Sequence, residues 1–281
     1  MNSLAFQTHY PYFPCLKNRN VRVVMIASPA RVLGRNIIEF IEKSGGMFLL
    51  LTRIFAESRT VIRDRYLILE QMELVGVRSL PLVAITSLFT GAVSSWQAAY
   101  QFEGFVSLSI LGGATSLAIF IELGPVLTAL VLAGRIGASI AAELGTMKVT
   151  EQIDALESLA ISPVRFLAMP RFWACITMLP ILTIFSEFIA LMGAFMVANQ
   201  LLGVSTAMFF DSVQQFFSLR NVFGGLAKAL VFGGTIAIVG CYVGFRTFGG
   251  AEGVGRSTIE AFVLSAALIL VNDYILATII F

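Results

Sequence analysis

Four ionisable residues stand within long apolar stretches: Glu122, Glu187, Lys228 and Asp273. A charge at the centre of a bilayer costs roughly 2.5–3.5 kcal/mol on insertion scales, so each should face protein, water or an opposite charge. We expect Lys228 to pair with Glu122 or Asp273. Two interpretations of such a cluster stay open: a structural group that fixes helix packing, or a functional group that lines or gates a cavity. Glu187 is interpreted as structural.

Few other residues could support catalysis or metal binding. The only histidine is His9, and Cys15, Cys175 and Cys241 have no CxxC spacing. We interpret the cysteines as inert, small apolar residues. The sequence lacks GxxxxGK[ST], the loop that binds nucleotide phosphates. We therefore expect no active site, metal or bound ATP in this chain, and a net charge of +2 does not indicate nucleic-acid binding.

Membrane-spanning helices must position the charged residues. Hydrophobic residues make up 57% of the chain and charged residues 13%, against about 25% charged residues in soluble domains. The mean hydropathy is +0.86. A helix needs about 20 apolar residues to cross the hydrocarbon core. The predicted fold is all-α, a polytopic membrane protein with about five transmembrane helices, at residues 81–100, 104–134, 170–202, 221–246 and 257–281.

The segment before the first span is predicted to behave differently. Residues 1–44 should form a cytoplasmic, partly disordered tail, and residues 45–63 an interfacial helix on the membrane, because the apolar run 45–56 is too short to cross it. The alternative is that this run starts a longer first span. Basic residues concentrate before the first span and after the second and fourth, so the N-terminus should be cytoplasmic and the C-terminus external.

A short amphipathic helix is predicted at residues 146–162, on the cytoplasmic side between the second and third spans. Thr150 can cap this helix, and Pro163 should end it. Glu151, Asp154 and Glu157 would form an acidic stripe on one face. Such a helix suits docking to a partner protein; an ordinary solvated loop helix is the alternative.

Two further features concern the surfaces of the spans. Trp96, Gln97 and Tyr100 lie at the outer end of the first span, where amphipathic aromatic residues form an interfacial belt. Gly240 and Gly244 form a GxxxG pair, a close-packing site either within one protomer or between two.

The sequence resembles the MlaE-type ABC-transporter permeases over one long, nearly ungapped stretch. Residues 122–163 read ELGPVLTALVLAGRIGASIAAELGTMKVTEQIDALESLAISP, and residues 170–174 read PRFWA. The family includes the bacterial Mla permease, its mycobacterial YrbE relatives and a chloroplast lipid-import permease. The resemblance covers about residues 45–281, which are taken as the permease domain. One departure is Ile121, where some relatives have arginine, so a positive charge there is absent or supplied elsewhere.

This resemblance implies a function and a set of partners. Two copies would form a homodimer in the bacterial inner membrane, above two copies of a cytoplasmic ATPase that binds ATP and Mg²⁺, so this chain itself carries no cofactor. A periplasmic MCE-domain protein would exchange phospholipid with the permease, and a STAS-domain subunit often accompanies the ATPase. Such transport would maintain the lipid asymmetry of the outer membrane.

The resemblance also implies roles for particular residues. The lipid cavity would be lined by the intramembrane charges and by the end of the first span: Glu122, Lys228, Asp273, Trp96, Gln97 and Tyr100. The helix at 146–162 would couple the permease to the ATPase through Met147, Thr150, Glu151, Asp154 and Glu157. The alternative function is a proton-coupled secondary transporter with Glu122 or Asp273 as its relay. We detect no inverted repeat among the five spans, which argues against this alternative.

Overall fold

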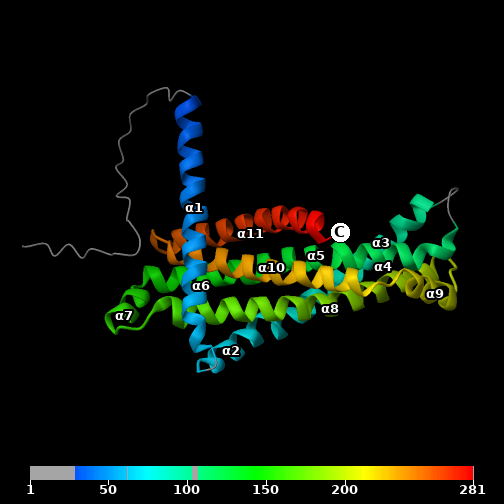
Figure 1. The fold of residues 1–281 in the computed structure, drawn as a ribbon, viewed down its shortest axis with the longest axis horizontal. Coiled ribbons are helices and arrows are strands. Elements are labelled where there is room, and N and C mark those ends of the chain that lie inside the picture. The colour runs from blue at the N-terminus through cyan, green and yellow to red at the C-terminus, as the bar shows by residue number, and fades with distance from the viewer. Residues whose placement is uncertain (1–28, 62, 103–106, 281) are drawn as a thin grey trace, which may run out of the picture. The chain divides into compact units, whose positions relative to one another are not determined.

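The computed structural model describes residues 29–61, 63–102 and 107–280, and every regular element among them is helical (Figure 1). The chain divides into two units, residues 1–43 and 44–281, and the second holds the spans. Most of the predicted tail, residues 1–28, lies outside the described residues. The α-helices are α1 (Pro29–Glu57), α2 (Arg65–Val75), α3 (Leu80–Phe102), α4 (Leu111–Ala118), α5 (Gly124–Leu132), α6 (Ala138–Val149), α7 (Gln152–Ser158), α8 (Met169–Gln200), α9 (Thr206–Phe216), α10 (Leu219–Phe245) and α11 (Gly250–Ile280).

Short turns of other helix types join these elements. The 3₁₀ turns are Ser58–Thr60, Val77–Ser79 and Leu108–Ile110, and the π-helical turns are Ile119–Leu123, Ala133–Gly137 and Val164–Ala168. The π turns lie where α4 meets α5, where α5 meets α6, and at the start of α8. They keep each of these rods continuous while changing its register.

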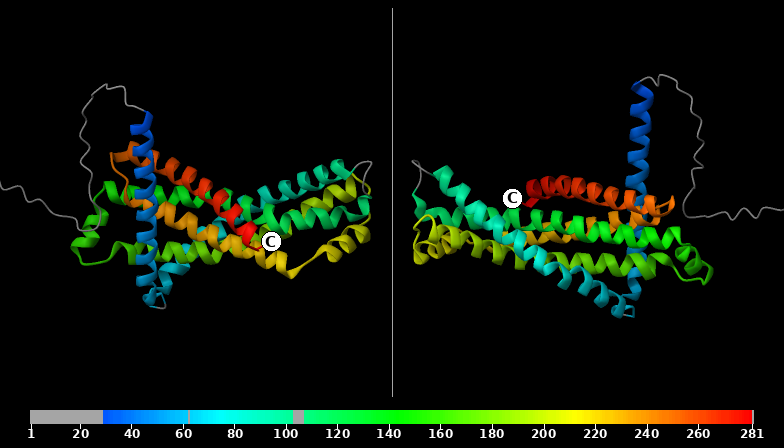
Figure 2. Two further views of the ribbon diagram at one scale, coloured as in Figure 1. Left: turned by 45° about the horizontal axis from the view of Figure 1, so that its top comes forward. Right: turned by 180° about the vertical axis from the view of Figure 1, so that it is seen from behind.

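The described residues contain five helical rods that are long and apolar enough to cross a membrane, which confirms the predicted all-α, five-span fold. They are Arg65–Phe102, Leu108–Val149, Val164–Gln200, Leu219–Phe245 and Gly250–Ile280. The first rod begins before residue 81 because only Gly76 and one 3₁₀ turn separate the charged helix α2 from α3. Figure 2 shows α2 and α3 as one bent rod. The second rod continues past residue 134 because α6 is rich in good helix formers.

The predicted interfacial helix exists with different bounds. It is the last part of α1, which ends at Glu57 rather than at residue 63. From Ser44 onward this helix crosses the long helices (Figure 1). The Phe55 ring packs edge-on against Phe172 and Trp173, with centroids 5.6 and 6.3 Å away. The turn after Glu57 separates this helix from the first span, so the alternative of a longer first span that includes it is wrong. Its location at a membrane surface stays a prediction.

Helix α8 lies at the centre of the bundle and touches α3 through backbone. A Cβ atom at Gly91 would lie 1.8 Å from the Ala190 carbonyl oxygen, and one at Gly193 would lie 2.2 Å from that of Leu88. Only glycine allows this approach, which is a common way to pack helices in membranes. The buried hydroxyls of Ser87 and Ser186 hydrogen-bond across the same seam at 2.7 Å. Helices α3 and α8 therefore run parallel in close contact.

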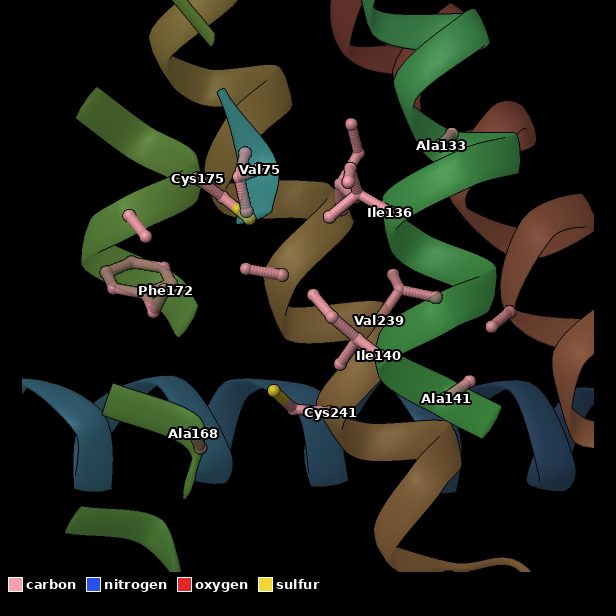
Figure 3. Packing of buried hydrophobic residues seen from close by; sticks show 14 of the residues in the cluster. Val75, Ala133, Ile136, Ile140, Ala141, Ala168, Phe172, Cys175, Val239 and Cys241 are labelled. Atoms are coloured by element: carbon pink, nitrogen blue, oxygen red, sulfur yellow. The ribbon is translucent and has the colours of Figure 1, made fainter. Parts of the chain in front are cut away.

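The GxxxG pair packs within the protomer. A Cβ atom at Gly244 would lie 2.7 Å from the Leu144 Cβ, and one at Gly240 would lie 3.1 Å from the Gly137 carbonyl oxygen. Helices α6 and α10 thus meet along this pair, beside the core that Figure 3 shows around Ile136, Ile140 and Val239. Cys175 and Cys241 belong to the same core and are fully buried free thiols, as their apolar surroundings predict.

Candidate functional site

The sequence around Glu122 leaves one backbone carbonyl without its helical hydrogen bond. Glu122 sits in the π-helical turn Ile119–Leu123, just before Pro125. Proline has no N–H, so the carbonyl of Ile121, four residues earlier, loses its helical partner. That carbonyl accepts a hydrogen bond from Lys228 Nζ at 3.2 Å. The proline therefore frees a backbone acceptor beside the Glu122 carboxylate.

A glycine brings α10 against this opening. A Cβ atom at Gly225 would lie 2.3 Å from the Phe120 carbonyl oxygen, so glycine is required there. Lys228 follows three residues later on the same face of α10. The close approach of the two backbones places the lysine side chain inside the bundle, where it is 0% exposed.

The expected pairing of Lys228 is observed, with both candidate acids. Its Nζ lies 2.6 Å from Glu122 Oε1 and 2.9 Å from Asp273 Oδ1. The ammonium group donates hydrogen bonds to the Ile121 carbonyl and to Glu122 Oε1, whereas its contact with Asp273 Oδ1 is an ion pair. Helices α10 and α11 and the π turn before α5 are joined at this point, because each supplies one charged side chain.

The two carboxylates are not fully enclosed by this chain. The Glu122 side chain is 42% exposed and that of Asp273 is 20% exposed. When all three groups are ionised, two negative charges share one positive charge. An exposed acid in a span must face water or protein rather than lipid. The arrangement can therefore hold a polar or cationic group at the surface of the rod bundle.

Glu187 lies near this cluster and makes different contacts. Its side chain is 3% exposed, and its Oε1 has no hydrogen-bond partner among the described residues. It packs where α8 passes Gly124 and Gly225, since Cβ atoms there would lie 2.7 Å from its Cγ and 3.6 Å from its Oε1. The structural interpretation of Glu187 stays a prediction.

The aromatic residues predicted near a lipid path lie on the outer face of α3. Trp96 and Tyr100 are 52% and 76% exposed, and Gln97 is also exposed. The buried side of this helix carries Ser95 and Ala99, which face the core. The structure thus leaves both interpretations open, a membrane belt or direct contact with lipid.

The predicted coupling helix at 146–162 is wrong in its extent. Its first residues complete α6, and only Gln152–Ser158 form α7. Thr150 does not cap α7: its hydroxyl donates to the Thr146 carbonyl at 2.8 Å, as a helix residue bonds its own preceding turn. Glu151 occupies the N-cap with a left-handed φ of 59° and makes no side-chain cap. Pro163 begins the next helical rod rather than ending this one, because Ala160 at φ 58° has already broken the chain direction.

The acidic stripe on α7 is partly neutralised. Lys148 Nζ bonds Asp154 Oδ1 at 2.7 Å, which ties α7 to the end of α6. Glu151 and Glu157 remain exposed. Met147 is half-buried and packs on the core, and Ile153 of α7 is buried. Below, the end of the bundle that carries α7 is called the α7 end.

The sequence interpretation missed two ion pairs at the α7 end. Arg171 of α8 is 3% exposed and lies 2.9 Å from Glu143 of α6. Arg165 donates hydrogen bonds from Nε to Asp64 Oδ2 at 2.9 Å and from Nη2 to Asp64 Oδ1 at 3.1 Å, which connects the turn before α2 to the π turn at the start of α8. Arginine and carboxylate are far apart in sequence in both pairs, so spacing could not reveal them. The only available signal was the presence of two arginines in and near PRFWA.

The family model described as "Permease MlaE" matches residues 68–279, from within α2 to the end of α11. The chain belongs to the MlaE permease family. The match includes the Lys228 cluster and α7, and leaves α1 outside.

Relatives of this MlaE permease extend over most of the chain. A probable ABC transporter permease protein of Synechocystis sp. is 45% identical over 213 residues, covering 76% of this chain and 81% of that protein. A probable ABC transporter permease protein of Rickettsia typhi is 40% identical over 92% of this chain and 99% of its own length. The chloroplast protein TRIGALACTOSYLDIACYLGLYCEROL 1 of Arabidopsis thaliana is 35% identical over 76% of this chain and 61% of that protein.

Proposed function

We propose that this MlaE permease is the membrane-spanning subunit of an ABC transporter that moves phospholipid between a bacterial inner membrane and a periplasmic MCE-domain carrier, so maintaining outer-membrane lipid asymmetry. The observation that carries the proposal is the Lys228 cluster, whose two acids are partly exposed within apolar spans. Charge at that depth calls for a water-filled or protein-covered cavity. A cavity with charged walls and apolar surroundings suits an amphipathic lipid.

A second copy of the chain would close this cavity. In each span, an apolar segment of 18 residues can be compared for burial. In α11, 11% of that segment is buried, against 56% in α10, so α11 is the least buried of the spans. That face carries large apolar residues, including Val263, Leu270 and Tyr274. Asp273 lies on the same helix as this face. A homodimer packed near α11 would cover apolar surface and enclose the carboxylates together.

A lipid substrate is also supported by a relative. The Arabidopsis protein carries the name of trigalactosyldiacylglycerol, a glycolipid. In this chain, Trp96, Gln97 and Tyr100 would contact a headgroup or upper acyl chain at the far end of α3 from α7. The lipid would then pass along α3, with the cluster deeper in the bundle.

A separate ATPase would supply energy at the α7 end. The chain has no phosphate-binding loop, and α7 presents Glu151 and Glu157 to solvent. We expect these two acids to bind basic residues of the ATPase, while Met147 and the Lys148–Asp154 pair hold α7 against the bundle. Closure of the ATPase would then push on α6 through α7. A STAS-domain subunit would accompany the ATPase.

Docking is tested by charge reversal on α7. The double variant Glu151→Lys/Glu157→Lys should lose ATPase in a pull-down from membranes, because both exposed charges change sign. The matched control is Glu252→Lys, since the Glu252 side chain is 87% exposed in the first turn of α11, at the α7 end. Equal recovery of ATPase with the double variant and with wild type would contradict this role for α7.

The function itself is tested by purification and reconstitution. The tagged full chain is isolated in mild detergent, and co-purifying proteins and lipids are identified by mass spectrometry. Recovery of an ATPase, an MCE-domain protein and bound phospholipid is expected. The complex in proteoliposomes should then move labelled phospholipid when ATP is added. A chain that moves its substrate with a proton gradient and without ATP would instead support the relay through Glu122 and Asp273.

A further inference from the structure

A second polar site lies at the α7 end, away from the Lys228 cluster. It is a groove of about 360 Å³ between α2 and the rod formed by the π turn Ala133–Gly137 and α6. Pockets that hold small molecules span roughly 300–1,000 Å³, so the groove is large enough for a polar headgroup. No residue of the Lys228 cluster lines it.

The groove is amphipathic. Its apolar lining includes Val75, Ile136 and Ile140, which are all buried. Its polar lining is exposed or half-buried: Gln71, Arg78, Arg135, Ser139 and Glu143. Figure 3 shows Val75 and Ile136 as part of the core beneath it. The groove thus has an apolar floor and a polar rim, which fits a molecule with a polar head and an apolar tail.

The charges of the rim are unbalanced in favour of an anion. Glu143, its only acid, pairs with buried Arg171 at 2.9 Å. Among the described residues, neither Arg78 nor Arg135 has a carboxylate within ion-pair distance. Arg135 uses Nη1 to bond the Ser79 hydroxyl and the Leu74 carbonyl, and no hydrogen bond in the described structure uses its Nη2. Two guanidinium groups therefore face the groove with free donors.

The donor set selects for phosphate. Arginine forks match the paired oxygens of phosphate and bind them in bidentate fashion. The Gln71 amide and the Ser139 hydroxyl add neutral donors on the same rim, and neither has a hydrogen-bond partner in the described structure. A tetrahedral anion with several acceptor oxygens is the ligand that would satisfy all four side chains.

The position of the groove favours a lipid as the carrier of that phosphate. Arg78 lies in the 3₁₀ turn Val77–Ser79, which immediately precedes the apolar helix α3, whose 23 residues are about 35 Å long at 1.5 Å per residue. The hydrocarbon core of a bilayer is about 30 Å thick. Arg78, and the groove it lines, therefore lie at the level of the phosphate groups of one leaflet.

We infer that this groove binds the phosphate-bearing headgroup of a membrane lipid through Arg78 and Arg135. The site is the point at which a lipid leaves or joins the leaflet at the α7 end on its way to or from the Lys228 cluster. This inference rests on the proposed lipid-transport function.

Photolabelling of the full chain tests the site. The protein is reconstituted in vesicles of digalactosyldiacylglycerol, which has no phosphate, containing a small amount of phosphatidylglycerol with a diazirine near its headgroup. Labelled peptides are then identified by mass spectrometry. The groove peptides around 71–78 and 135–143 should be labelled, whereas a diazirine diacylglycerol without phosphate should not label them. Equal labelling by both probes would reduce the arginines to ordinary interfacial anchors and overturn the inference.

Variants identify the arginines as the cause. Arg78→Gln should lower groove labelling about tenfold, because it removes one charge-assisted contact and no internal bond of the chain. Arg135→Lys keeps the charge and the reach to Ser79, and should retain more labelling than Arg135→Gln. Arg65→Gln is the matched control, since Arg65 is exposed at the start of the same rod, Arg65–Phe102, and does not line the groove. Unchanged labelling of Arg78→Gln and Arg78→Glu would refute the site.

Two further measurements distinguish a lipid headgroup from a soluble phosphate ester, and the groove site from the transport function. Glycerol 3-phosphate at millimolar concentration should not displace the lipid probe; displacement would assign the groove to a soluble phosphate ester instead. ATP-driven lipid movement is measured in parallel with the wild-type complex. Phosphate-dependent labelling without any lipid movement would refute the transport function and leave the site. Lipid movement without phosphate-dependent labelling would refute the site and leave the function.

Discussion

Replacing Lys228 by methionine removes the positive charge and keeps the apolar stem. The ammonium is 0% exposed and lies within 3.2 Å of three oxygen atoms. Its loss leaves the Glu122 and Asp273 carboxylates facing each other. Removing one partner of a buried ion pair costs about 3–5 kcal/mol, and the partial exposure of both acids places this case near the lower limit. We therefore expect a loss of about 3 kcal/mol in the free energy of unfolding.

The assay is thermal stability of the purified full chain in detergent, followed by size-exclusion chromatography after heating. A cost of this size should lower the apparent Tm by about 6–12 °C, at about 2–4 °C per kcal/mol for a larger domain. Lys148→Met is the control, because its pair with Asp154 is 30% and 32% exposed and should contribute less than about 1 kcal/mol. An unchanged Tm for Lys228→Met would refute this account of the cluster.

A triple variant decides between the two interpretations of the cluster. Lys228→Met combined with Glu122→Gln and Asp273→Asn removes all three charges together, and neutral replacement of a whole buried pair is often close to neutral in stability. The Tm should therefore recover. If lipid transport stays lost in the recovered protein, the cluster acts in transport. Recovery of transport together with stability would make it a structural group.

Four further substitutions test the packing and the site. Gly91→Ala should destabilise the protein by more than about 2 kcal/mol, because the new Cβ atom meets the Ala190 carbonyl. Gly45→Ala adds a Cβ atom that meets nothing within 4 Å, so it should stabilise α1 by up to about 1 kcal/mol. Paired thermal melts measure both effects. Pro125→Ala restores an N–H that competes with Lys228 for the Ile121 carbonyl, so transport should fall more than Tm; a normal transport rate would argue against the freed carbonyl. Arg171→Met should lower the Tm less than Lys228→Met does, because Glu143, the partner of Arg171, is 53% exposed and can turn to solvent. An equal loss of Tm in the two variants would contradict this ranking.

Composition and apolar runs were enough to predict the fold class and the five spans. The pairing of Lys228 was also predictable, because a lone cation in a span needs an acid and only a few acids lie at that depth. The sequence could not choose between Glu122 and Asp273, since the answer depends on Gly225 and Pro125 bringing α10 against a π turn.

Other features followed from contacts that no sequence pattern reveals. The boundary between α6 and α7 was misplaced because Thr150 fits both a cap and a helix end, and the tertiary structure selected the second. The charges of α2 concealed its continuity with α3. The groove between α2 and α6 went unnoticed because Arg78 and Arg135 come from separate rods and were interpreted only as indicators of topology.

The small-residue seams of the bundle differ in a way that bears on how it can change shape. Where Gly91 and Gly193 sit against backbone of the opposite helix, α3 and α8 interlock, so sliding one past the other would force atoms into contact. Helix α11 instead buries a narrow stripe, from Gly253 through Ser257, Ala261 and Ser265 to Ile269, with mostly small side chains. A shallow seam of this kind opposes a tilt far less. We therefore expect α3 and α8 to move as one rigid body during transport, while α11 tilts relative to them. Because Asp273 lies on α11, this tilt would break and re-form its ion pair with Lys228.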